Sequence, residues 1–181
     1  ESARLMVSAA ASLKYVFQKI ERDFEKTHPE HQITLNVGSS GILKRQIENG
    51  APVDVFASAR SRLVDDLEKR GRVQSGLRFV MARNRLVLIA PRNTTIQSFS
   101  RLYDNFKGRF AIGNPRHVPA GFYAKEALES LGLWRSLSSN MVLGENVLQV
   151  LNYVALGEVD AGLVYKTDEA QGKGRVKLIA E

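Results

Sequence analysis

The sequence has 181 residues, of which 44% are hydrophobic and 25% charged, a composition typical of a globular protein with a packed core. Lys and Arg exceed Asp and Glu by 26 to 19, which gives a formal charge of +7 and suggests anionic partners. Cys is absent, so thiol nucleophiles, disulfides and cysteine-ligated metal sites are excluded, and no apolar run reaches the ~18 residues of a membrane span.

Short apolar runs alternate with segments of helical periodicity through the first part of the chain. The predicted strands are residues 5–7, 33–37 and 53–57, and the predicted helices run from Leu13 to Phe24, Leu43 to Ile47 and Leu63 to Leu67. Gly50 and Gly71 are expected to follow the ends of the last two helices. This alternation is typical of a parallel sheet covered by helices.

A second series of the same kind follows the long apolar segment 79–91, which is predicted as a strand or strand pair. The later predicted strands are 109–112, 141–143, 159–165 and 176–179, with helices from Tyr123 to Leu131 and from Val147 to Val154. Because the pattern restarts, we expect two α/β lobes of mostly parallel sheets flanked by helices, residues 1–81 and 82–181, with a crossover strand near 79–91.

Four predicted strand-to-helix turns are small and polar. They are Ala9–Ser12, Gly38–Gly41, Val118–Gly121 and Gly144–Val147. Ligands of parallel α/β sheets bind at such turns, because helix N-termini offer unpaired N–H groups and about half a positive charge. Ordinary capping also explains Ser12 and Ser40 individually, so it is the combination of two turns in each lobe that favours an anion-binding site.

The histidines, the aspartates and the distribution of charged residues argue against an enzyme or a nucleic-acid-binding protein. His28 and His31 lie in a predicted exposed turn, and neither paired zinc ligands nor a Gly-x-Ser-x-Gly nucleophile turn occurs. Asp54 and Asp160 lie in apolar strands, where we expect hydrogen-bonded structural carboxylates. Basic and acidic residues are interspersed, which predicts a solvated surface rather than a nucleic-acid-binding patch.

Several longer stretches carry a resemblance to a known family. They are Ser8–Leu13, Gly38–Gly41, Gln46–Ala59, Gly113–Gly121, Ala124–Leu128 and Ala161–Tyr165, and the Pro-x-His-Val-Pro-Ala-Gly run at 115–121 is the most specific. These stretches resemble the periplasmic molybdate-binding proteins of bacterial ABC importers, over the whole chain and in order. The resemblance implies a two-lobed periplasmic-binding-protein fold with a cleft between the lobes, and high-affinity capture of the oxyanion molybdate or tungstate.

The resemblance also implies the ligand residues, which are Ser12, Ser40, Ala120, Val147 and Tyr165. Ser12 acts through its hydroxyl and amide, Ser40 (or its neighbour Ser39) and Tyr165 through hydroxyls, and the other two through their amides. Molybdenum enters only within the oxyanion, without a direct bond to the protein, and no cofactor is expected. The implied protein partner is the membrane permease of the importer.

We further expect a periplasmic monomer that binds no nucleic acid. The sequence begins at Glu1 without a basic and apolar leader, so either a signal peptide has been removed or the chain was trimmed. Members of the family continue past a strand like 176–179 into a return segment, which we expect to be missing here. The alternatives are a binder of another tetrahedral oxyanion such as sulfate, and the ligand-sensing domain of a transcription regulator.

Overall fold

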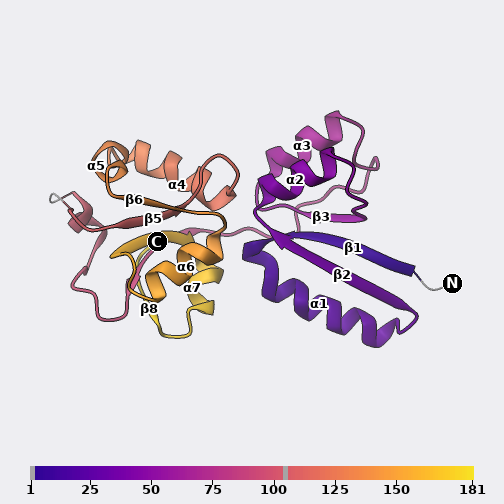
Figure 1. The fold of residues 1–181 in the computed structure, drawn as a ribbon, viewed down its shortest axis with the longest axis horizontal. Coiled ribbons are helices and arrows are strands. Elements are labelled where there is room, and N and C mark those ends of the chain that lie inside the picture. Colours follow the sequence, from indigo (N-terminus) through magenta and orange to yellow (C-terminus); the bar gives the residue numbers. More distant parts are fainter. Residues whose placement is uncertain (1–2, 104–105) are drawn as a thin grey trace. The chain divides into compact units, whose positions relative to one another are not determined.

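The structure is a computed structural model that describes residues 3–103 and 106–181. The chain forms two compact units, residues 1–81 and 82–181, and the ribbon of each is drawn in Figure 1. Within the described residues, every helix is too short or too polar to cross a membrane.

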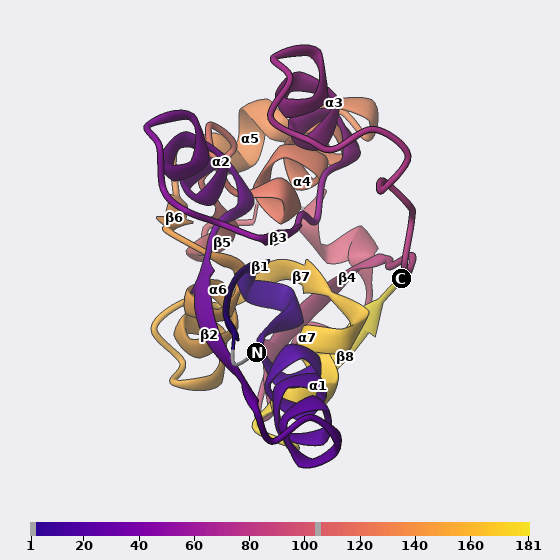
Figure 2. The ribbon, with the colours of Figure 1, turned by 90° about the vertical axis from the view of Figure 1, so that its right-hand side faces the viewer.

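The first unit is built on a three-stranded parallel sheet. In spatial order its strands are β2 (His31–Gly38), β1 (Ala3–Ala10) and β3 (Val55–Ala57). The helices are η1 (Ala11–Leu13), α1 (Lys14–Thr27), α2 (Ser40–Glu48) and α3 (Ser61–Lys69). Helix α1 lies on one face of the sheet, and α2 and α3 lie on the other (Figures 1 and 2). The strands and helices predicted for this unit are therefore present. β1 and β2 are longer than predicted, and β3 is shorter, so that Asp54 precedes the strand instead of lying in it.

Helix α1 has the predicted apolar periodicity but buries none of its residues. Val16 and Ile20, which the pattern assigns to the core face, are 45% and 43% exposed. The spacing of apolar residues identifies the helix correctly, but it cannot indicate whether another element covers that face.

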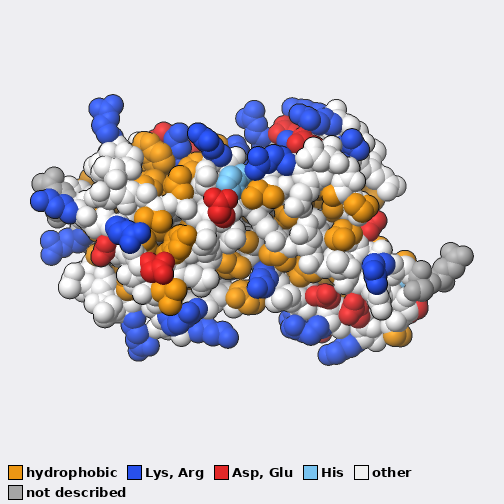
Figure 3. All heavy atoms as spheres, viewed as in Figure 1, with side chains coloured by type: hydrophobic (Ala, Val, Ile, Leu, Met, Phe, Trp, Pro, Cys, Tyr) orange, Lys and Arg blue, Asp and Glu red, His pale blue; other side chains and the backbone are white. Residues whose placement is uncertain are grey.

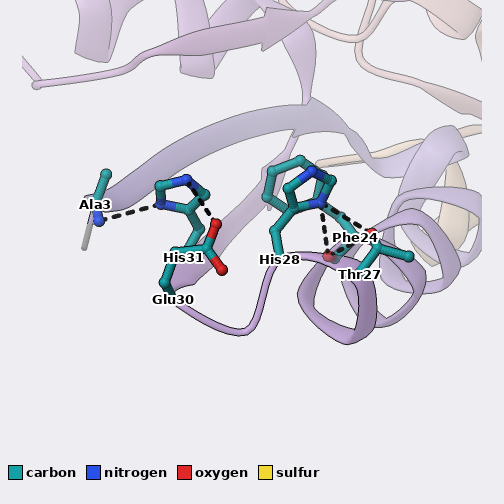
Figure 4. A network of polar contacts seen from close by, with 6 residues as sticks. All are labelled: Ala3, Phe24, Thr27, His28, Glu30 and His31. Carbon is teal, nitrogen blue, oxygen red and sulfur yellow. Dashed lines mark hydrogen bonds and ion pairs between the residues drawn. The ribbon is translucent and has the colours of Figure 1, made fainter. Parts of the chain in front are cut away.

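Two histidines form polar contacts at the turn between α1 and β2 (Figure 4). The N–H of His28 donates to the Phe24 carbonyl at 2.8 Å, and the two rings stack with centroids 4.5 Å apart. Nδ1 of His31 accepts the N–H of Ala3 at 3.2 Å, and its Nε2 lies 3.4 Å from a carboxylate oxygen of Glu30. These contacts give both histidines structural roles. The described residues also include no cluster of three or more His, Asp or Glu side chains suited to a metal ion.

The second unit contains a mixed five-stranded sheet. In spatial order its strands are β6 (Met141–Gly144), β5 (Phe110–Gly113), β7 (Ala161–Tyr165), β4 (Leu86–Pro91) and β8 (Val176–Ala180). β5 is parallel to β6 and β7, whereas β4 is antiparallel to β7 and β8. The helices are η2 (Phe99–Leu102), α4 (Pro119–Ser130), α5 (Trp134–Ser138), α6 (Val147–Ala155) and α7 (Lys166–Gln171). Helices α4 and α5 cover one face of the sheet, and α6 and α7 cover the other (Figures 1 and 2).

The prediction of a crossover strand near 79–91 is wrong for its first half. β4 begins at Leu86, and residues 79–85 have no regular secondary structure. Phe79 and Val80 are 81% and 72% exposed, and no strand of the described residues pairs with this segment. An apolar run forms a strand only where a neighbouring strand takes up its backbone hydrogen bonds, and residues 79–85 lack that neighbour.

Candidate functional site

Two of the predicted ligand turns lie in the second unit, where β5 and β6 end side by side. Gly113 pairs with Gly144 at the ends of the two strands, and the N–H of Asn114 donates to the Gly144 carbonyl at 2.8 Å. Because the strands are parallel, α4 and α6 both begin at this edge of the sheet. β7 is parallel to β5 and therefore ends at the same edge, which brings Tyr165 there as well.

The amides of Ala120 and Val147 occupy the first turns of α4 and α6. Ala120 is the second residue of α4, after Pro119, and Val147 is the first residue of α6. Both residues are almost fully buried, and Asn146 caps α6 by accepting the N–H of Gln149 at 3.0 Å. The first N–H groups of a helix have no partner within the helix, so these positions present donors at the positive ends of two helix dipoles.

Two glycines allow α4 to begin directly against the end of β5. A Cβ atom on Gly121 would lie 1.8 Å from the carbonyl oxygen of Gly113, and a Cβ on Gly113 would lie 2.4 Å from Val118. Neither contact is sterically tolerable, so any larger residue would push the first turn of α4 away from the strand. The glycines therefore set the position of the Ala120 amide.

Tyr165 carries a buried hydroxyl whose oxygen has no hydrogen-bond partner among the described residues. The residue is 6% exposed, and burial raises the pKa of its phenol above the ordinary value, with smaller contributions from Tyr123 and Asp168. Leaving a buried polar group unpaired costs about 1–3 kcal/mol, so such a group calls for an explanation such as a missing ligand.

Asp168 is a buried carboxyl group next to Tyr165 that the sequence analysis did not single out. It is 1% exposed, and its Oδ2 accepts the backbone N–H of Tyr165 at 3.0 Å. Burial raises the pKa of this carboxyl to about 7, and the hydrogen bond from Tyr165 lowers it by less. An acidic residue at the third position of a helix is a known capping signal, which could have identified it once the end of β7 was known.

The other two predicted turns lie in the first unit, beyond the paired ends of β1 and β2, where Ala10 lies opposite Gly38. Ser12 is half-buried in η1, and Ser40 is the fully buried first residue of α2. Oγ of Ser40 accepts the N–H of Ala59 at 3.1 Å, so its own proton is still available for donation. Ser39 is also buried and is the N-cap residue of α2.

The remaining polar residues singled out from the sequence have structural partners. Asp54 accepts the N–H of Met6 at 2.8 Å and Asp160 accepts the N–H of Arg109 at 2.7 Å, which confirms both as structural carboxylates.

On the face seen in Figure 3, Lys and Arg side chains are spread over both units with acidic side chains among them.

His117 lies in the loop before Ala120, with its Nε2 3.4 Å from Oε2 of Glu145 in the neighbouring turn. The pair therefore links the two turns that carry the amides of Ala120 and Val147. This contact gives His117 a structural partner of its own.

Comparison with known proteins identifies the family. Residues 5–180 match the family described as bacterial extracellular solute-binding protein. The chain is 41% identical to the lipoprotein YvgL of Bacillus subtilis (strain 168), over 98% of this chain and 68% of that protein. It is 37% identical to the molybdate-binding protein ModA of Escherichia coli (strain K12), over 99% of this chain and 72% of that protein.

A solved structure agrees. The periplasmic molybdate-binding protein of Azotobacter vinelandii superposes with a TM-score of 0.80 at 28% identity, over 89% of this chain and 71% of that one. The fold expected from the sequence, a periplasmic-binding-protein fold of α/β type, is thereby confirmed. The chain therefore belongs to the bacterial extracellular solute-binding proteins, which serve ABC transporters as substrate-binding components and are not enzymes.

Proposed function

We propose that this protein captures molybdate or tungstate and delivers it to the membrane permease of an ABC importer. The observation that carries the proposal is the buried hydroxyl of Tyr165, which has no hydrogen-bond partner within the described residues. Tyr165 is the last residue of β7, a strand that ends at the sheet edge where α4 and α6 begin. A ligand that accepts hydrogen bonds would satisfy this hydroxyl. Relatives named as molybdate-binding proteins, at 34% and 37% identity, support molybdate as that ligand.

The proposed donors are all neutral. They are the hydroxyls of Ser12, Ser40 and Tyr165 and the amides of Ser12, Ala120 and Val147. A tetrahedral dianion has four oxygens that each accept hydrogen bonds, and helix N-termini stabilise negative charge without a cationic side chain. Because Ser40, Ala120 and Val147 are almost fully buried, hydrogen bonds from these residues would be little weakened by water.

The proposal also concerns where the protein works and with what. We place it outside the cytoplasmic membrane, in the periplasm after removal of a signal peptide, as the family description "extracellular" suggests. Its partners are the oxyanion and the permease. It works as a monomer, without a cofactor and without a direct bond between protein and molybdenum.

Calorimetric titration with molybdate, tungstate, sulfate and phosphate at physiological salt tests the proposal. We expect tight binding of molybdate or tungstate and much weaker binding of sulfate. Equal affinity for sulfate would favour the alternative of a general tetrahedral-oxyanion binder. Tight binding of duplex DNA that weakens steeply with salt, together with no oxyanion binding, would favour the regulator alternative.

A further inference from the structure

The carboxyl group of Asp168 has no role in the proposed donor set, yet it is buried against one of its members. Asp168 is the third residue of α7, and Tyr165 is the residue that precedes this helix. The Asp168 side chain reaches back to the N–H of Tyr165 at 3.0 Å, and within the described residues it forms no ion pair. This bond, part of the capping box of α7, ties a buried carboxyl group to the residue whose hydroxyl is a proposed donor.

The backbone on both sides of the Tyr165 Cα atom is fixed by hydrogen bonds. The N–H of Tyr165 itself is held by Asp168, and the next N–H along the chain, that of Lys166, donates to the Arg85 carbonyl at 2.9 Å. Tyr165 also lies opposite Leu86 in the β4–β7 ladder. With both peptide groups held, only the side-chain torsions of Tyr165 determine where its hydroxyl points, and burial restricts those torsions.

We propose that Asp168 is a positioning residue for oxyanion binding, which keeps the hydroxyl of Tyr165 aimed at the ligand by holding the Tyr165 backbone. The inference rests on the proposed function, because it takes the Tyr165 hydroxyl as a ligand donor. A hydrogen bond is sensitive to direction, so a shift of the backbone at the end of β7 weakens the contact without removing the hydroxyl.

Asp160 offers a matched control in the same unit. The carboxylate of Asp160 also accepts a backbone N–H from another residue, that of Arg109, at 2.7 Å. This bond lies just before the first residues of β5 and β7, at the opposite end of β7 from Tyr165. Asp160→Ala therefore removes the same kind of bond at a place that the proposal does not connect with Tyr165.

The test is a double-mutant cycle read out by molybdate titration. Asp168→Ala should weaken binding about tenfold in the wild-type background and less than about twofold in the Tyr165→Phe background, because the hydroxyl that it positions is then absent. Asp168→Asn keeps a carbonyl oxygen that can accept the Tyr165 N–H, and should restore affinity to within about threefold. Equal losses in both backgrounds, or an equal loss for Asp160→Ala, would overturn the proposal.

A second measurement needs no ligand and so separates this proposal from the proposed function. In protein labelled with ¹³C at the tyrosine ζ carbon, the Tyr165 signal is the one that Tyr165→Phe removes. Asp168→Ala should shift that signal and leave those of Tyr15 and Tyr103 in place. An unmoved Tyr165 signal would overturn the positioning role even if molybdate binds tightly. A shifted signal in a protein that binds no oxyanion would refute the proposed function and leave the positioning of the Tyr165 hydroxyl standing.

Discussion

Replacing Tyr165 with phenylalanine should weaken molybdate binding and, at the same time, stabilise the ligand-free protein. The substitution removes a single oxygen that is buried and has no hydrogen-bond partner in the part of the chain that the structure describes. Its removal relieves part of the ~1–3 kcal/mol cost of an unpaired buried polar group, so we expect the free energy of unfolding to rise by about 1 kcal/mol. The benzene ring of phenylalanine fills the space of the tyrosine ring, so only the small volume of the hydroxyl oxygen is left empty and little cavity cost opposes this gain.

The effect on binding has the opposite sign. A hydrogen bond to a charged ligand is worth about 1.5–3 kcal/mol, so Tyr165→Phe should raise the dissociation constant of molybdate roughly 10- to 150-fold. Urea denaturation without ligand measures the first effect, and calorimetric titration measures the second. Loss of stability combined with unchanged affinity would refute the reasoning, because it would mean that the hydroxyl has a partner within the protein.

Tyr103→Phe is the matched control. The hydroxyl of Tyr103 donates to the Leu131 carbonyl at 3.0 Å, and the residue is 53% exposed. Its removal should lower the free energy of unfolding by about 1 kcal/mol or less and leave molybdate affinity unchanged. The two Tyr→Phe variants should therefore change stability in opposite directions.

Three further predictions concern Gly121, Ser40 and Asp168. Gly121→Ala should weaken molybdate binding at least tenfold, measured by titration, because its Cβ would meet the Gly113 carbonyl at 1.8 Å and displace the first turn of α4. Ser40→Ala should cost about 1 kcal/mol of stability in urea denaturation, because it removes the hydrogen bond to the part-buried N–H of Ala59, and it should also weaken binding. Burial raises the pKa of the Asp168 carboxyl from 3.8 to about 7. The protonated carboxyl therefore contributes fully to the free energy of unfolding below pH 3.8, and this contribution is lost as the pH rises through about 7. The total loss is up to about 4 kcal/mol. Asp168→Asn should flatten that dependence, and an unchanged profile in denaturation at successive pH values would contradict the assignment.

The local sequence pattern predicted where helices and strands form better than it predicted which of their faces are buried. Val147, Val150, Leu151 and Val154 recur at helical spacing, and all four are buried in α6. The same reasoning applied to α1 found the helix but not the exposure of Val16 and Ile20. The difference lies in the neighbouring elements, because spacing reports the shape of a segment, whereas burial depends on chain that is distant in sequence. The antiparallel direction of β4 escaped prediction for the same reason.

In the candidate site, too, some features could be predicted from local sequence and others could not. The turns before α2, α4 and α6 follow from small residues at strand ends, which sequence displays directly. Local pattern alone does not distinguish Tyr165 from a core tyrosine at the end of an apolar strand, and only the family resemblance singled it out. That its hydroxyl has no hydrogen-bond partner within the described residues becomes visible only once the surrounding side chains are in place. Asp168 escaped notice because its role depends on where β7 ends, and element boundaries are poorly determined by local pattern.

The excess of basic residues and the proposed neutral donors would act at two different stages of anion capture. A formal charge of +7, carried by side chains spread over the surface, attracts anions from a distance without selecting among them, and salt screens that attraction. The proposed amide and hydroxyl donors, which lie near the contacts made by Gly121, Asn146 and Asp168, would act only at contact, where their directions must match the oxygens of the ligand. On this proposal, selectivity between oxyanions of equal charge would depend on where those donors are held, so residues that hold the backbone would contribute to it together with residues that touch the ligand.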